Sequence, residues 1–437
     1  MAIILLFVYF VIMNWVFYLV VSIIISILIS FQVILYRRWR KRLSPYRWWP
    51  LVSKIWFSLF IITQLPLATM LIIGRSNFTI AYENGLQLFY YIFTAWNYSF
   101  LGAFPIWLVA TGILSLISWL TSREKPEIVP PAIEQKQKAQ KDNLSRSQFL
   151  KNTLGASMIM ADALPLAGFT FSLGGMFLGS SGFSVFHREK KIPGLHRDLV
   201  GLKIMQISDL HIGNLINEQY LKTAAELMRS EKADLLTVTG DIIDNNNYFI
   251  PTAAAFFQGL ESSFPLGIYG ILGNHDHIDN GDHFYNTLHT RGINLLRNDS
   301  IIVPRGKGKL NLAGLDYPMP LRRRSGVRMQ KSKEFFDSLQ PKIDPELPTI
   351  VMNHHPSDFE YLKKEAVDLV LSGHTHGGQF MFSQNRDSVL ALAGNFYRYF
   401  IDMYEENGRS LYVNRGFGHW FPLRIGCPPE ITVITLT

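Results

Sequence analysis

The stretch LKIMQISDLHIG, residues 202–213, decides the fold of the carboxyl-terminal part of the chain. It starts as an apolar, β-branched run, which is typical of a buried strand, and ends in the polar pair Asp209 and His211. The same pattern, an apolar run that ends in polar residues, recurs in LLTVTGDIID (235–244), YGILGNHD (269–276), TIVMNHH (349–355) and DLVLSGHTH (368–376). We therefore expect strands whose carboxyl ends carry these polar side chains and hold them rigidly.

The polar residues at the predicted strand ends form a nitrogen and oxygen ligand set without thiolates. Such a set suits Mn, Fe or Zn better than Ca. Asp209 and His211, on an extended segment and the turn after it, can face one cation, and the carboxylate of Asp241 can bridge two. Two divalent ions about 3.5–4 Å apart can share a hydroxide that attacks phosphorus. The sequence therefore predicts a two-metal phosphoester hydrolase with the ligands Asp209, His211, Asp241, Asn274, His354, His374 and His376.

Residues beside these ligands are predicted to complete the catalytic machinery. His275 is assigned as general acid or as hydrogen-bond donor to the transition state. Asp244 is placed to orient a ligand histidine, and Asp276 is a further candidate for such a supporting role. His355 and His277 are predicted not to bind metal, because neighbours on a strand point to opposite faces.

The amino-terminal part of the chain is predicted to be a membrane domain. Residues 1–36, 55–74 and 84–122 contain no charged residue, and each run is long enough for the roughly 20 residues that cross a bilayer. A basic linker rich in Lys, Gln, Glu and Pro follows and is expected to be a solvated tether. The predicted domains are 1–122 (about three spans), 123–153 (basic cytoplasmic linker), 154–186 (a fourth span or an interfacial segment) and 187–437 (catalytic domain).

Charge and cysteine content narrow the class of protein. The formal net charge is +8, but positive residues gather beside the apolar runs, as in RRWRKR at 37–42. Positive charge there indicates membrane topology and contact with anionic lipid, so we expect a bilayer and no nucleic acid as partner. With Cys427 as the single cysteine, an intrachain disulfide and a cysteine metal cage are both excluded.

The stretch 154–186 decides on which side of the membrane the catalytic domain lies. The basic residues at 37–42 place the first loop in the cytoplasm, and single passes of the second and third apolar runs then return the chain there. If 154–186 crosses, the catalytic domain is extracytoplasmic, and otherwise it is cytoplasmic. Asp162 within this stretch is either a functional intramembrane acid or a residue at the interface.

SDLHIG, TGDIID, GNHD, NHHP and SGHTHGGQ resemble the calcineurin-like metallophosphoesterase superfamily, in its bacterial membrane-linked branch, over about residues 202–437. The resemblance implies an α/β domain built as a β-sandwich flanked by helices. It also implies a loop at Gly416 and Gly418 that closes over the site. In the implied ligand sets, one metal ion takes Asp209, His211, Asp241 and His376, and the other takes Asp241, Asn274, His354 and His374.

A second resemblance concerns SRSQFLK, residues 145–151, which is similar to a twin-arginine export signal. Ser147 stands in place of the second arginine. This similarity favours an extracytoplasmic catalytic domain. The basic residues that follow Phe186 favour the opposite, cytoplasmic side.

The sequence as a whole indicates a multi-pass protein of the cell inner membrane with a metal-dependent phosphoesterase domain. The expected substrate is a phosphate mono- or diester that is membrane-proximal or lipid-linked. One alternative is a pyrophosphatase that acts on a UDP-acylated sugar in envelope lipid synthesis, which requires a cytoplasmic site. Alternatives of another class are a non-catalytic scaffold, expected to have lost metal ligands, and a membrane sensor. The oligomeric state stays open.

Overall fold

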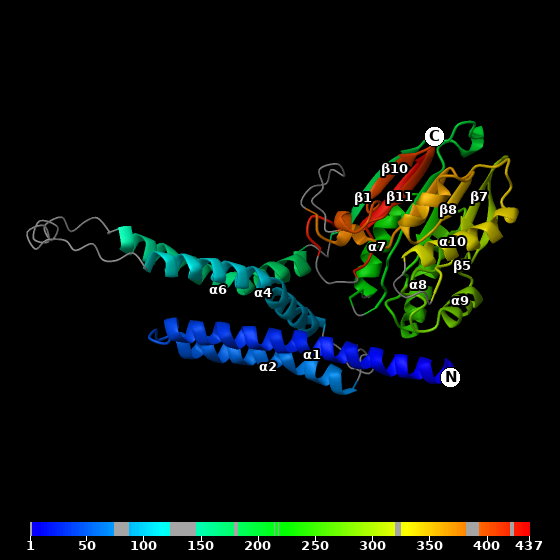
Figure 1. Ribbon diagram of the computed structural model, residues 1–437. Helices are drawn as coiled ribbons and strands as arrows, with labels where there is room; N and C mark the ends of the chain where they lie inside the picture. Colours follow the sequence, from blue (N-terminus) through cyan, green and yellow to red (C-terminus); the bar gives the residue numbers. More distant parts are fainter. Residues whose placement is uncertain are drawn as a thin grey trace, which may run out of the picture. The chain divides into compact units, whose positions relative to one another are not determined.

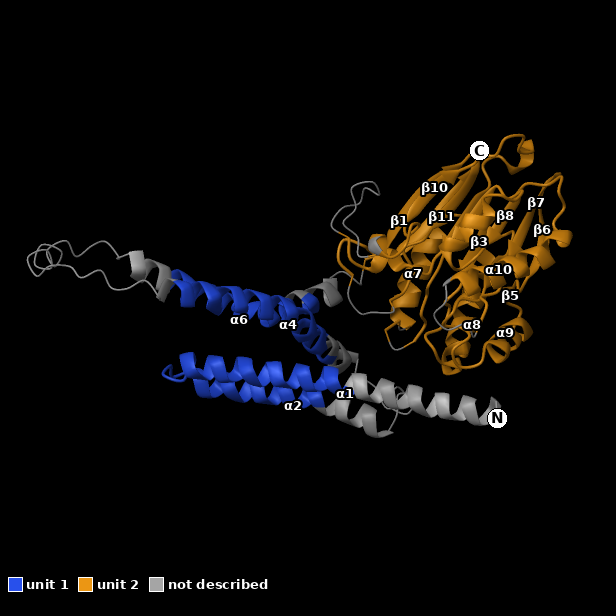
Figure 2. Ribbon diagram, viewed as in Figure 1, with its two compact units in different colours: residues 1–173 blue, residues 174–437 orange. Residues whose placement is uncertain are grey.

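The computed structural model forms two compact units, unit 1 (Met1–Leu173) and unit 2 (Gly174–Thr437), which Figure 2 distinguishes by colour. The described residues are 2–73, 87–122, 146–178, 182–213, 215–216, 218–319, 325–381, 393–419 and 424–437.

In its described residues, unit 1 is helical. Three stretches are long and apolar enough to cross a membrane, namely Ser22–Leu43, Ala95–Leu120 and Asn152–Thr170. Apolar composition of this kind is compatible with a membrane domain. The helices, labelled in Figure 1, are α1 (Ala2–Leu43), α2 (Trp49–Ile73), α4 (Gln87–Ser122) and α6 (Arg146–Leu178), which runs a few residues into unit 2.

Aromatic side chains make the core of unit 1. The rings of Phe31 in α1 and Trp107 in α4 lie 4.9 Å apart, and those of Trp56 in α2 and Trp96 in α4 lie 5.3 Å apart. Aromatic rings bury a large apolar area and favour edge-to-face contacts, so they fix how these helices pack.

The segment around the unit boundary differs from the expectation in two respects. Residues 123–145 of the predicted tether lie outside the described residues, but 146–153 belong to α6 and are not an irregular tether. Helix α6 continues through Pro165, within the stretch predicted to be a fourth span or an interfacial segment. Unit 2 begins its first strand at Ser184, slightly before the predicted start of the catalytic domain.

Unit 2 is an α/β domain. Its strands are β1 (Ser184–Lys190), β2 (Lys203–Ile207), β3 (Leu235–Thr239), β4 (Ile268–Ile271), β5 (Asn294–Leu295), β6 (Asp299–Arg305), β7 (Gly308–Gly314), β8 (Thr349–Met352), β9 (Leu369–Ser372), β10 (Asp402–Glu406), β11 (Arg409–Val413) and β12 (Glu430–Leu436). Its helices are α7 (Glu218–Ser230), α8 (Ile250–Leu260), α9 (Gly281–Thr290), α10 (Ser325–Leu339) and α11 (Phe359–Leu362).

The strands of unit 2 form two mixed six-stranded sheets, with orders β1-β12-β2-β3-β4-β5 and β10-β11-β9-β8-β7-β6. In the first sheet β2, β3, β4 and β5 are parallel, and β12 runs antiparallel to β2. In the second sheet β7, β8, β9 and β11 are parallel, and β6 and β10 run antiparallel at the edges. The carboxyl ends of β2, β3 and β4 therefore meet at one edge, as do those of β8 and β9.

Side chains that point alternately to the two faces of each strand create the layers of unit 2. In β2, Ile204 joins the core between the sheets, whereas Met205 and Ile207 pack on the opposite face with α7 and α8. In β8, Ile350 faces the same inner core, and Val351 packs outward with α10 and α11. Successive side chains on a strand point to opposite faces, so apolar strands buried on both faces give a sandwich with helices outside. This confirms the predicted α/β domain.

Candidate metal centre

Each predicted strand-end residue lies where the sequence places it. Asp209 follows β2, Asp241 follows β3, and Asn274 follows β4, all in the first sheet. His354 follows β8 and His374 follows β9 in the second sheet. Backbone hydrogen bonds join neighbouring strand ends, from the amide of Asp209 to the carbonyl of Gly240 (2.9 Å) and from that of Gly373 to His354 (3.0 Å).

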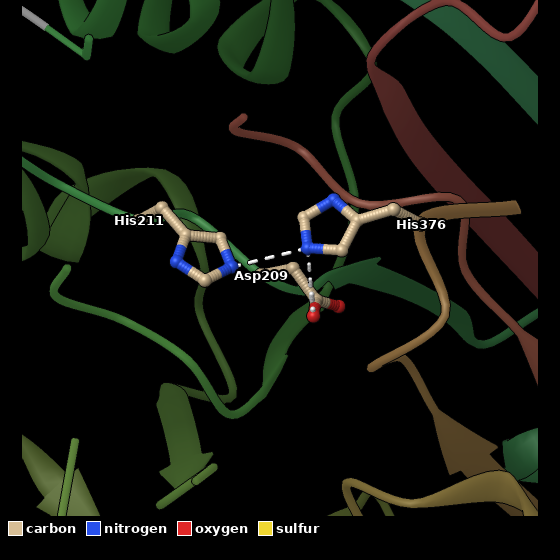
Figure 3. Close-up of side chains that lie close together, drawn as sticks. All are labelled: Asp209, His211 and His376. Carbon is tan, nitrogen blue, oxygen red and sulfur yellow. Dashed lines mark hydrogen bonds and ion pairs between the residues drawn. The ribbon is translucent and has the colours of Figure 1, made fainter. Parts of the chain in front are cut away.

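The first group of candidate ligands is Asp209, His211 and His376 (Figure 3). Nε2 of His211 and Nε2 of His376 lie 3.0 Å apart, and the latter lies 3.3 Å from Oδ1 of Asp209. All three residues are buried, and their candidate ligand atoms lie within 4.8 Å of one another.

The second group is Asp241, His354 and His374, with Asn274 beside it. Nε2 of His354 lies 3.2 Å from both Nδ1 of His374 and Oδ2 of Asp241. Oδ1 of Asn274 lies 2.9 Å from Nδ1 of His374. Nδ1 of His354 contacts the carbonyl of Thr239 at 2.7 Å, which fixes the ring with Nε2 toward the other ligands.

Asp241 faces both groups. Its Oδ2 lies 3.2 Å from His354 in the second group and 3.7 Å from Nε2 of His211 in the first. Its Oδ1 accepts a hydrogen bond from the backbone amide of His275 at 2.7 Å. The structure thus brings together all seven predicted ligands around one central carboxylate.

The chemistry of these atoms fits divalent cations. Imidazole nitrogens, carboxylate oxygens and an amide oxygen converge within hydrogen-bonding distance of one another, with few protons to share between them. Buried lone pairs in such an arrangement repel each other unless a positive ion lies among them. First-row transition metals accept this mixture of donors, so both groups are suited to hold one ion each.

The backbone at the candidate ligands is strained. Asp209, His211, Asp241, His374 and His376 all have positive φ angles, between 46° and 70°. For residues other than glycine this left-handed conformation costs of order 1–3 kcal/mol, and such residues cluster at functional sites. The expectation that Asp209 and His211 leave the strand in an extended conformation was wrong, and the left-handed turns aim both side chains at one point.

Glycines permit the close approach of the loops. A Cβ atom at Gly273 would lie 2.2 Å from Oδ1 of Asp241. At Gly373 it would lie 2.2 Å from Oδ2 of Asp209 and 1.9 Å from Oγ of Ser208. Neither position can take a side chain without displacing a candidate ligand, which explains the Gly-Asn and Gly-His pairs of the motifs.

Electrostatics keep most of these groups in the form that binds metal. Burial raises the pKa of Asp209 and of Asp241, but nearby imidazoles, His376 and His354 respectively, outweigh it and hold both values below the usual range. Burial and His354 lower the pKa of His374 to about 3, and burial lowers that of His376 to about 4. His354 is the exception, because Asp241 overcomes burial and raises its pKa to about 9.

Two predicted supporting residues lie beside the ligands. Oδ1 of Asp244 lies 3.8 Å from Nδ1 of His211 and 3.4 Å from Nδ1 of His275. Burial lowers the pKa of His275, but Asp241 and Asp244 prevail and raise it to about 9. His275 is partly exposed and is therefore placed to meet a substrate.

Asp276 is fully buried and contacts backbone amides. Its Oδ1 accepts from Ile242 (2.8 Å) and Ile243 (3.0 Å), and its Oδ2 accepts from Gly273 (2.8 Å). Burial and then Asp241 raise its pKa to about 6. It therefore ties the loop after β3 to the loop after β4 and acts on the site through the backbone.

Sequence reasoning missed Arg424, which is almost fully buried behind the first group. Its Nη2 lies 3.3 Å from Nδ1 of His376 and donates to the carbonyl of Gly418 at 2.6 Å. Gly418 in turn donates its amide to the carbonyl of Asp209 at 2.8 Å, and a Cβ at Gly416 would lie 2.6 Å from Nδ1 of His376. This loop lies against the site, but no local pattern marks Arg424.

The other histidines near the site have different contacts. His277 pairs through Nε2 with Asp316 at 2.8 Å. The ring of His355 packs on that of His374, with centroids 4.3 Å apart, and its Nδ1 accepts the amide of Ser357. Neither belongs to a group of candidate ligands among the described residues.

A cavity of about 310 Å³ opens beside both groups. His275 lines it, together with Phe396 and Tyr397. Phe396 is 77% exposed, and the hydroxyl of Tyr397 lies 3.5 Å from Nε2 of His374. The cavity is therefore lined by aromatic side chains as well as by candidate metal ligands.

Comparisons with known proteins agree with this chemistry. A family model described as calcineurin-like phosphoesterase matches residues 202–378. The uncharacterized metallophosphoesterase YkuE of Bacillus subtilis is 31% identical over 297 residues, which cover 67% of this chain and 98% of that protein.

More distant similarities were also found. The UDP-2,3-diacylglucosamine pyrophosphatase LpxG of Chlamydia trachomatis is 26% identical over 306 residues, covering 56% of this chain and 85% of that protein. Among solved structures, phosphopantetheinyl hydrolase of Mycobacterium tuberculosis is 14% identical, with a TM-score of 0.31, over 51% of this chain and 92% of that chain.

Proposed function

The chain belongs to the calcineurin-like metallophosphoesterase family of phosphoester hydrolases, and on that premise we propose that it is a membrane-anchored, two-metal phosphoesterase acting on a lipid-linked or membrane-proximal phosphate ester. The observation that carries the proposal is the position of Asp241 between two groups of candidate ligands. Two divalent ions held there would activate water and neutralise the phosphoryl oxygens. Mn, Fe and Zn are the ions that suit the ligand set.

The residues of the chain have separate roles in this proposal. Asp209, His211 and His376 hold one ion, His354, His374 and Asn274 hold the other, and Asp241 is shared. His275 lines the cavity beside Asp244, and it donates a proton to the leaving group or a hydrogen bond to a phosphoryl oxygen. Asp244 keeps the His275 ring oriented.

The apolar helices of unit 1 support a membrane location. Three stretches are long and apolar enough to cross a bilayer, so we place the chain in the cell inner membrane as a multi-pass protein. A tether raises the effective concentration of the site only toward substrates at that surface. The exposed Phe396 at the cavity mouth fits an acyl or prenyl chain beside the phosphate.

A second candidate function is cleavage of the pyrophosphate of a UDP-acylated sugar, favoured by the similarity to the LpxG proteins of two Chlamydia species at 26% and 25% identity. It requires a catalytic domain on the cytoplasmic side, where nucleotide sugars occur. A scaffold without catalysis is disfavoured, because all seven predicted ligands are present. The division into two units is also compatible with a membrane sensor, in which the helices of unit 1 detect a signal and the esterase of unit 2 is the output.

The test is hydrolysis by the full-length protein in mixed micelles. Candidate substrates are a lipid phosphate, a lipid diphosphate, UDP-2,3-diacylglucosamine and soluble p-nitrophenyl phosphate. The proposal expects a kcat/KM at least about tenfold higher for a lipid substrate than for the soluble ester, and the Phe396→Ser variant should lose that preference. Release of UMP from the acylated nucleotide sugar would favour the second candidate, and equal kcat/KM for lipid and soluble esters would contradict membrane specificity.

A further inference from the structure

Asp162 in α6 is a fully buried carboxylate that two arginines of α1 contact. Nε of Arg38 donates to Oδ2 at 2.9 Å, and Nη1 of Arg42 donates to the same oxygen. The other oxygen, Oδ1, accepts from the indole nitrogen of Trp107 in α4 at 2.8 Å. Both carboxylate oxygens are therefore engaged, and three helices of unit 1 meet at this cluster.

The cluster carries more positive than negative charge. Two guanidinium groups face one carboxylate, which leaves an excess of one positive charge at neutral pH. Asp162 is the one acidic residue within the described part of unit 1. The side chains of Arg38 and Arg42 are 31% and 32% exposed, so both remain partly accessible although each contacts Asp162.

The two guanidiniums are fixed before any ligand arrives. Arg38 and Arg42 are four residues apart on one helix, so they lie on the same face. The guanidinium of Arg38 also lies over the ring of Trp107, 5.7 Å from its centroid. Guanidinium forks match the geometry of phosphate oxygens, and side chains that are already ordered lose little entropy on binding.

Aromatic side chains place this cluster near a membrane surface. Just beyond Arg42, the exposed rings of Tyr46 and Trp48 stack with centroids 5.4 Å apart. The half-buried Trp39 packs on Trp56 at 5.1 Å. Trp and Tyr concentrate where a membrane meets water, at the depth of lipid phosphates.

We propose that Arg38 and Arg42, held by Asp162 and Trp107, form a binding site for the phosphate group of an anionic membrane lipid. The site takes one singly charged phosphate between the two partly exposed arginine side chains, and this charge balances the cluster. The proposal rests on the membrane location of unit 1 and is independent of catalysis by unit 2. A free phosphate ion presents the same chemistry, and the experiment distinguishes the two sources.

The test is lipid retention by the full-length protein, measured by native mass spectrometry after reconstitution in equal amounts of phosphatidylglycerol and phosphatidylcholine. Variants are Arg38→Gln, Arg42→Gln and Arg42→Lys, with Arg40→Gln as the matched control. Arg40 is exposed on the same helix, and within the described residues it has no contact with Asp162. A parallel series contains inorganic phosphate in place of the anionic lipid.

The proposal predicts selective retention of phosphatidylglycerol, with affinity reduced at least tenfold in both glutamine variants. Arg42→Lys should lose most of this affinity, because lysine keeps the charge but lacks the fork. Arg40→Gln should lose no more than the roughly fivefold that one surface charge contributes. Arg42→Lys keeps the positive charge, so it still tests the proposal if a glutamine variant fails to fold.

Three results would overturn the proposal. If the Arg40 and Arg42 variants lose the same affinity for phosphatidylglycerol, the lipid is attracted by diffuse positive charge and not by a site. If phosphatidylglycerol and phosphatidylcholine are retained equally, the protein does not select the anionic lipid. Binding of inorganic phosphate that depends on Arg38 and Arg42, without lipid selectivity, would assign the site to a free ion.

Discussion

Oδ1 of Asp244 lies 3.4 Å from Nδ1 of His275. The same oxygen lies 3.8 Å from Nδ1 of His211, so one carboxylate faces both the candidate acid and a candidate ligand. Burial raises the pKa of Asp244, but the interactions with His211 and then His275 outweigh it, and the carboxyl stays ionised at neutral pH. Asp244 therefore links His211, a candidate metal ligand, to His275, the proposed proton donor.

We expect Asp244→Asn to lower kcat by about 10–100-fold, because the amide removes the charge that orients both rings. Steady-state hydrolysis of bis(p-nitrophenyl) phosphate measures kcat, and bound metal is measured in the same preparation. An unchanged kcat would contradict the orienting role.

His275→Gln should reduce kcat by about 10²–10⁴-fold with the metal content unchanged, because the variant loses a proton donor and no ligand. The control is His289→Gln, an exposed residue of α9. If full activity toward the diester persists in the His275 variant, the acid assignment is wrong.

Gly373→Ala tests the close approach of the loops. The new Cβ would lie 2.2 Å from Oδ2 of Asp209, so we expect loss of metal affinity and a stability cost of about 1–3 kcal/mol. Gly259→Ala in α8 is the control, because nothing lies within 4 Å of its Cβ, and it should be neutral or slightly stabilising. Equal effects of the two substitutions would refute the steric argument.

Much of unit 2 could be predicted from the sequence because the signals are local. Apolar runs such as the one before Asp209 mark strands by themselves, and parallel strands bring their carboxyl ends together. The left-handed backbone at Asp209 and His211 was not predicted, since tertiary contacts impose it on residues other than glycine.

Contacts between distant parts of the chain escaped prediction for a related reason. Arg38 and Asp162 are 124 positions apart, and nothing local to either shows that they pair. Arg424 contacts His376 from a segment without any motif. Such pairs follow from the packing of whole elements, which composition and periodicity do not specify.

A pH-dependent prediction concerns Asp316, which contacts His277 at 2.8 Å and Arg297 at 2.6 Å. Burial raises its pKa, but hydrogen bonds from His277 and Arg297 lower it below the usual value. Its ionised form therefore stabilises the folded state above the unfolded pKa of about 3.9, and this contribution is lost as pH falls through the folded pKa.

We expect Asp316→Asn to lower the free energy of unfolding by about 1–3 kcal/mol at neutral pH and progressively less as pH falls toward 3. Thermal melts of the full-length protein at several pH values measure the difference. Asp282→Asn removes the exposed partner of Arg297 and should change the melting temperature little. If the stability difference between the wild-type protein and Asp316→Asn does not vary with pH, the ionised carboxylate is not its cause.

Two metal ions that share Asp241 are central to the proposed function, and metal content measured together with turnover tests their presence directly. The full-length protein is stripped with a chelator, titrated with Mn, Zn or Fe, and assayed with bis(p-nitrophenyl) phosphate at each step. We predict that turnover disappears on chelation and returns fully only when about two ions are bound per chain, and that Asp241→Asn binds fewer ions and stays inactive. Full turnover with one ion per chain, or turnover that chelation does not affect, would contradict the two-metal site.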